Sequence, residues 1–120
     1  MDREKFSSLV VQAVTDLPPE FYERLENVDV VVEDQPTAAQ LAKARVQPGQ
    51  TLFGLYEGVP LTKRSSGYGN VLPDKVTIFQ NSIEAAYHDD EIAAAIGSVL
   101  RHEIAHHFGI SDDRLQELGK

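Results

Sequence analysis

Two histidines and a glutamate near the C-terminus have the residue types and the spacing of a metal site. Residues 101–113 read R-H-E-I-A-H-H-F-G-I-S-D-D and contain the pattern H-E-x-x-H. Each residue of a helix turns by about 100°, so His102 and His106, four residues apart, stand on one face and can share a metal ion. Glu103 lies within the same broad face. It can reach a water molecule on that metal without being a ligand itself.

A third ligand is expected just beyond the end of this helix. Gly109 is predicted to end the helix, because glycine adopts the left-handed conformation without a Cβ penalty. A turn there would bring Asp112 back toward His102 and His106. Two imidazole nitrogens and one carboxylate leave the fourth tetrahedral position open, which is typical of a catalytic Zn²⁺ site. The alternative is a charged amphipathic helix with a glycine cap, in which Asp112 belongs to the start of the next helix.

The two remaining histidines are not predicted to bind the metal. On a helical wheel His107 points away from the two ligand histidines, which indicates a packing or supporting residue. His88 is expected at the surface, because it sits beside Asp89 and Asp90 at the start of a helix.

Three stretches of the chain resemble one protein family. They are H-E-I-A-H-H-F-G-I-S-D-D-R-L, L-Y-E-G-V-P-L-T (Leu55–Thr62) and V-T-I-F-Q (Val76–Gln80). They look like the small bacterial zincin-like proteins described as zinc metallopeptidases, and the resemblance covers most of the chain. It implies a minimal zincin fold with Zn²⁺ and, by analogy, peptidase activity. It also implies that Val76–Gln80 is the sheet edge that pairs with an extended peptide substrate. The alternative for that strand is an ordinary inner strand.

The pattern H-E-x-x-H-x-x-G-x-x-D is also similar to the metzincins that use aspartate as third ligand. The only methionine is Met1, so the methionine turn that floors a metzincin site has no counterpart downstream. Only residues 110–120 follow Gly109, so we expect no C-terminal subdomain to wall a deep cleft. Short or flexible peptides are therefore the expected substrates.

Composition limits the class of protein. The 120 residues are 42% hydrophobic and 25% charged, which predicts a single soluble domain over residues 1–120. No apolar run approaches the length of a membrane span and the segment M-D-R-E-K-F is too polar for a signal peptide, so a cytoplasmic location is expected. The absence of cysteine excludes disulfides and thiolate ligands. A net charge of −8 argues against nucleic acid and anionic membranes as partners.

The elements that would position the site predict an α+β fold: a small mixed sheet of three or four strands packed against a long active-site helix. Apolar periodicity and turn residues predict helices over Asp2–Leu17, from Pro19, over 37–45, over Asp90–Phe108 and over Ser111–Leu118. They predict strands over Val28–Val32 (buried on both faces), Thr51–Tyr56 and Lys75–Gln80, with Val59–Thr62 continuing the pairing and 81–88 as a connector. Gly54 inside its strand indicates a bulge or a close backbone approach. The apolar stripe of the long helix, through Val99, is expected to continue into the metal-site residues.

Glu103 is predicted to be the catalytic general base. It would take a proton from the zinc-activated water that attacks a peptide carbonyl and would pass it to the leaving amine. Tyr56, Tyr68 or Arg64 could stabilise the oxyanion. The last two lie in the basic, glycine-containing segment 63–70, which is either a surface connector or a rim over the metal. Two other functions remain open: a zincin-derived peptide-binding or regulatory module without catalytic activity, and hydrolysis of a non-peptide amide.

Overall fold

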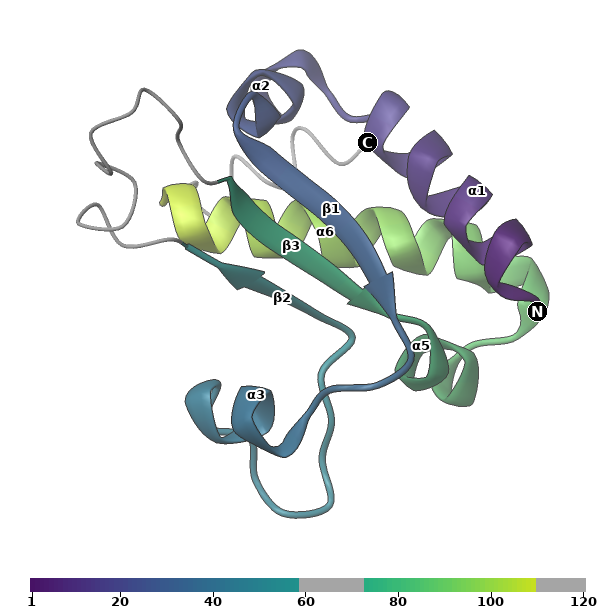
Figure 1. Cartoon of the computed structure of the whole chain (residues 1–120). Helices are drawn as coiled ribbons and strands as arrows, with labels where there is room; N and C mark the ends of the chain where they lie inside the picture. The colour runs from purple at the N-terminus through teal and green to yellow at the C-terminus, as the bar shows by residue number, and fades with distance from the viewer. Residues whose placement is uncertain (59–72, 110–120) are drawn as a thin grey trace.

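A three-stranded mixed sheet, ordered β1-β3-β2, is the centre of the fold (Figure 1). The computed structural model describes residues 1–58 and 73–109. Strand β3 (Asp74–Phe79) pairs in parallel with β1 (Val28–Glu33) and antiparallel with β2 (Gly54–Glu57). The α+β class, with a small mixed sheet and a long C-terminal helix, is confirmed.

The position of β3 corrects one expectation. This strand is the middle strand of the sheet, so Val76–Gln80 is not an edge, and Gln80 already begins the next helix. Val76 and Ile78 are fully buried, as a central strand requires. Strand β1, which was expected to be buried on both faces, is instead an outer strand of the sheet that the described residues form, and its residues are mostly half-buried. The outer strand nearest the metal-site motif is β2.

Helices α1 (Arg3–Thr15) and α6 (Ile92–Phe108) pack together on one face of the sheet (Figure 1). Helix α1 begins where predicted, because the Asp2 carboxylate accepts a hydrogen bond from the backbone N–H of Lys5 at 2.7 Å. The shared core contains Phe6, Val10, Phe21, Val76, Ile78, Ile83, Ile92, Ile96, Leu100 and Ile104. The shorter helical elements are α2 (Pro19–Tyr22), η1 (Glu23–Leu25), α3 (Ala38–Lys43), α5 (Gln80–Ala86) and η2 (Asp89–Glu91).

Helix α6 carries the metal-site motif at its C-terminal end. It stops at Gly109, which has the predicted left-handed conformation with φ of 70°. Its buried side continues from Ile96 through Leu100 to Ile104, whereas Val99, which was expected in the same stripe, is only half-buried. The exposed histidines of the motif therefore lie beside the core stripe and not in line with it.

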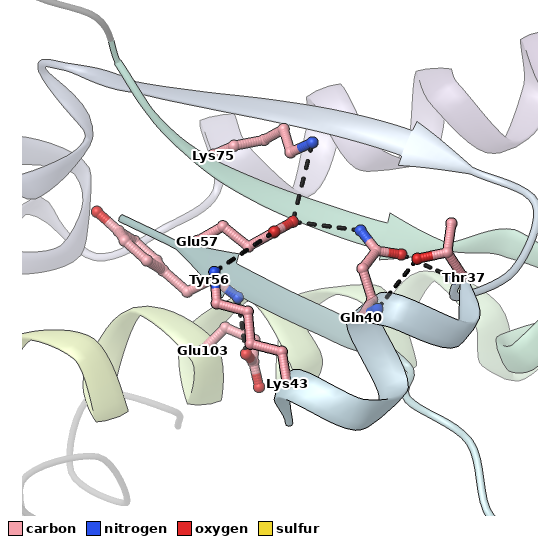
Figure 2. Close-up of polar contacts among 7 residues, drawn as sticks. All are labelled: Thr37, Gln40, Lys43, Tyr56, Glu57, Lys75 and Glu103. Carbon is pink, nitrogen blue, oxygen red and sulfur yellow. Dashed lines mark hydrogen bonds and ion pairs between the residues drawn. The ribbon is translucent and has the colours of Figure 1, made fainter. Parts of the chain in front are cut away.

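Helix α3 contacts β2 through polar side chains that meet at Glu57 (Figure 2). The Thr37 hydroxyl caps the helix by accepting from the N–H of Gln40, and the Gln40 side chain accepts from the N–H of Thr37. Gln40 also donates to Glu57 at 3.2 Å, and Lys43 and Lys75 lie 3.9 and 3.8 Å from the same carboxylate. Partly exposed ion pairs contribute little to stability, so their main effect is to fix the orientation of Glu57.

Several predictions lie outside the described residues. They are the strand continuation Val59–Thr62, the basic segment 63–70, the last helix Ser111–Leu118 and the third ligand Asp112. Within residues 1–58 and 73–109, no helix combines the length and the apolar character that crossing a membrane requires.

Candidate active site

Glu103 is held between α6 and the edge strand β2. Its Oε1 atom accepts a hydrogen bond from the backbone N–H of Tyr56 at 3.1 Å (Figure 2). Burial raises the pKa of the Glu103 carboxyl above its ordinary value, although the Tyr56 N–H and the two nearby imidazoles, His106 and His102, oppose this rise. A carboxyl group whose pKa is raised takes up a proton more readily near neutral pH.

The contact of His102 with the backbone of α6 leaves its Nε2 atom available to a metal. Its Nδ1 atom lies 2.8 Å from the carbonyl oxygen of Ser98, one turn earlier in α6. A carbonyl oxygen can only accept, so Nδ1 must carry a proton, and in the neutral ring Nε2 then holds the lone pair. A ring nitrogen fixed in this way by its partner is typical of metal-binding histidines.

His106 is exposed on the same side of α6, and the centroid of its ring lies 6.2 Å from that of His102. These two imidazoles are the donors that Zn²⁺ prefers, so the residues present fit this metal. In the described parts of the chain, no cluster of three histidine, aspartate or glutamate side chains is placed to hold an ion. Asp112 lies beyond Gly109 and outside those parts, so its role as third ligand stays a prediction.

A shallow groove of about 330 Å³ opens beside His102 and Glu103. Its other lining residues are Thr51, Leu52, Phe53, Gly54, Tyr87, Ser98 and Val99. Phe53 and Tyr87 form an aromatic wall, with ring centroids 5.8 Å apart. The volume is at the lower end of the range for ligand pockets, roughly 300–1,000 Å³. The groove is therefore large enough for a small part of a ligand next to His102 and Glu103.

The hydroxyl group of Tyr56 is used elsewhere. It donates to Asp74 at 2.7 Å, and the Asp74 carboxylate is buried. The imidazole of His107 stacks on the Tyr56 ring at 3.8 Å, with 15° between the planes, and its Nε2 lies 3.8 Å from Asp74. His107 is thus a packing residue, as predicted. Of the three oxyanion candidates, Tyr56 is held by Asp74, and Tyr68 and Arg64 lie outside the described residues.

Two contributions to the site were missed from the sequence. One is the backbone N–H of Tyr56, which cannot be recognised from the sequence because every residue except proline has this group. The other is Asp74, whose only signal was an acidic residue at the start of an apolar strand.

Comparison with known proteins identifies the family and the fold. The sequence model of the zincin-like metallopeptidase family matches residues 25–120, and the chain belongs to this family. The fold is similar to the solved structure of a conserved hypothetical protein from Thermo thermophilus, with a TM-score of 0.59 and 22% sequence identity. That similarity covers 90% of this chain and 94% of the other, and it shows the fold alone. No curated protein matches the sequence.

Proposed function

We propose that this protein is a zinc-dependent metallopeptidase that hydrolyses peptide bonds in short or flexible peptides. The observation that carries the proposal is the Glu103 carboxylate, which is partly buried beside two exposed histidines and fixed by the Tyr56 N–H. Membership of the zincin-like family supports zinc as the cofactor.

His102 and His106 would hold the Zn²⁺ ion, with Asp112 as the proposed third ligand. When bound there, the ion would act as a Lewis acid that polarises the peptide carbonyl and makes water more acidic. The proton on Nδ1 of His102, directed at the Ser98 carbonyl, keeps the ring in the orientation and tautomer for binding through Nε2.

Glu103 would move the proton. Its carboxylate would take a proton from the attacking water, while the oxygen of that water forms a bond to the peptide carbonyl carbon. The same group would then protonate the amine as the C–N bond breaks, leaving a carboxylate and a free amine. The raised pKa of Glu103 favours this role, because the base must hold the proton between the two steps.

The edge strand β2 would align the peptide. The carbonyl of Phe53 accepts a bond from the N–H of Phe79 at 2.9 Å, so in the antiparallel pattern the backbone groups of Gly54 and Tyr56 point away from β3. Because the Tyr56 N–H is already bonded to Glu103, an extended peptide would pair by strand addition mainly with Gly54 on this side, with one side chain in the groove beside His102. The substrate-binding edge that the family implies is therefore proposed for β2.

The Glu103→Gln variant tests the peptidase activity. It removes the carboxylate at nearly constant size, and we expect zinc content and fold to be kept while hydrolysis of a quenched fluorescent peptide library falls by roughly 10²–10⁴-fold. Glu57→Gln is the matched control, because it makes the same carboxylate-to-amide change on strand β2, next to Tyr56, in a side chain that contacts α3 and not Glu103. Its hydrolysis should stay within about twofold of wild type. If Glu103→Gln instead lost its zinc, Glu103 would be a metal ligand, and the proposed mechanism would be wrong.

A peptide-binding or regulatory module without catalysis is the second candidate. The open groove beside His102 and Glu103 favours it, because a shallow site does not exclude water from a reacting peptide bond. Wild type and Glu103→Gln would then bind the same peptides with equal affinity, and neither would cleave any peptide of a broad library. The retained Glu103 carboxylate favours the peptidase, because peptide binding alone does not require a general base.

A further inference from the structure

Gly54 lies where the edge strand β2 crosses helix α6. A Cβ atom at this position would meet Val99 Cγ1 at 2.5 Å, the Thr77 carbonyl oxygen at 3.2 Å and Glu103 Cγ at 3.5 Å. The first distance is too short for any real contact. Valine is stiff at χ1 in a helix, so Val99 cannot turn aside to make room. Any side chain at position 54 must therefore push β2 and α6 apart.

The close approach matters because β2 also holds the side chain of Glu103. The Tyr56 N–H that binds the Glu103 carboxylate is two residues from Gly54, on the same side of the strand. The hydrogen bond spans 3.1 Å, and a separation of a few tenths of an ångström would take it out of the favourable range. The distance between β2 and α6 at Gly54 therefore also sets the distance between the Tyr56 N–H and the Glu103 carboxylate.

We propose that Gly54 is a positioning residue for Glu103. The absence of its side chain lets β2 lie against Val99, and this contact places the Tyr56 N–H on the Glu103 carboxylate. The inference rests on the proposed function for the role of Glu103 in hydrolysis, but the positioning itself can be measured without a substrate.

The chain supplies a compensating variant and a control. Val99→Ala removes the methyl group that a Cβ at position 54 would strike, so Gly54→Ala combined with Val99→Ala should restore the approach. Gly97→Ala is the matched glycine control in α6. Among the described residues, the added Cβ there would meet only the Nη1 atom of Arg101, at 3.2 Å, which is the movable end of a long side chain.

The test is backbone amide hydrogen exchange by NMR in all these variants, together with peptide hydrolysis. In Gly54→Ala, we expect the Tyr56 amide to exchange about tenfold faster or more, the equivalent of losing a hydrogen bond to a charged group. The central-strand amides should keep their protection as a measure of global stability. Glu103→Ala should accelerate the same Tyr56 amide. The Gly54→Ala, Val99→Ala double variant should return both exchange and hydrolysis to within a few-fold of the Val99→Ala single variant, and Gly97→Ala should match wild type.

Two results would overturn the proposal. One is a Tyr56 amide in Gly54→Ala that is as protected as in wild type. The other is a folded double variant that recovers neither protection nor hydrolysis. Because the exchange measurement needs no substrate, a wild-type protein that cleaves no peptide would refute the proposed function, and the exchange result would still decide the role of Gly54.

Discussion

The Tyr56 hydroxyl donates a 2.7 Å hydrogen bond to the buried carboxylate of Asp74, and this bond ties the edge strand to the centre of the sheet. Tyr56 contacts the site in two ways. Its backbone holds Glu103 while its ring stacks on His107, next to a proposed zinc ligand.

Tyr56→Phe should therefore destabilise the fold. A hydrogen bond to a buried charged group contributes about 1.5–3 kcal/mol, and urea denaturation should report a loss of this size in the free energy of unfolding. Tyr22→Phe is the control, because Tyr22 is 56% exposed, and its stability should change by less than about 0.5 kcal/mol. At a temperature where Tyr56→Phe is folded, kcat should stay within a few-fold of wild type. A fall of about 10²-fold or more would instead make Tyr56 the oxyanion donor.

Zinc binding should depend on both histidines of the motif. Metal analysis of His102→Ala and of His106→Ala should show loss of the near-equimolar zinc expected for wild type. Asp112→His should keep zinc, because an imidazole also fits a tetrahedral site. His88→Gln, at an exposed position before η2, is the control and should retain wild-type zinc. Equal zinc affinity of Asp112→Ala and wild type would show that the third ligand is another residue.

Two glycine-to-alanine changes in the same region should have opposite effects on stability. Gly97 has helical conformation, and an added Cβ would meet the movable end of Arg101 at 3.2 Å, so Gly97→Ala should raise the free energy of unfolding by about 0.5–1 kcal/mol. Gly109 has a φ of 70°, so Gly109→Ala should lower it by about 1–2 kcal/mol although no atom of residues 1–58 and 73–109 obstructs the new Cβ. Chemical denaturation of both variants checks the signs, and a stabilising Gly109→Ala would contradict the left-handed end of α6.

Stability should depend on pH through the Met1 amine and Glu84, which lie 2.8 Å apart. The hydrogen bond to Glu84 raises the pKa of the amine above 8.0, and the hydrogen bond to the amine lowers the pKa of Glu84 below 4.5. The contribution of the Glu84 carboxylate to stability is fully present above the pKa that Glu84 has in the unfolded chain. It is lost as pH falls through the lower pKa of Glu84 in the folded protein. The amine contribution is present below 8.0 and is lost as pH rises through its folded pKa.

Protein with an unmodified Met1 amine should therefore exceed Glu84→Gln in stability most strongly between about pH 5 and 8, with the difference shrinking on either side. Thermal unfolding across this range measures the difference. Acetylation of the amine should remove the same contribution, and a difference that did not vary with pH would rule out the ion pair as its source.

Local features of the site were predictable from the sequence. The helix, its end at Gly109 and the exposed pair of histidines follow from spacing and from the conformational freedom of glycine, which act within a few residues. The close backbone approach at Gly54 was also indicated by a glycine inside a strand. Each of these depends on a residue and its immediate neighbours.

Long-range relationships were not predictable in the same way. An apolar strand such as Val76–Phe79 indicates burial, but the order of strands depends on pairings between distant segments, so β3 was wrongly expected at the edge. The bond from Tyr56 to Glu103 uses a backbone N–H that every residue except proline has. Sequence patterns cannot select one such donor among many.

The parallel pairing of β1 with β3 also sets an order of folding. These strands are separated by α3 and β2, so joining them closes a long loop, which is slow compared with forming α6. Strand β2 has only β3 as its strand partner among the described residues, and Glu103 gains its Tyr56 contact only when β2 is in place. We therefore expect helical signal to appear early in refolding, the Tyr56–Glu103 contact to follow once β2 pairs with β3, and the pairing of β1 with β3 to be the slowest phase.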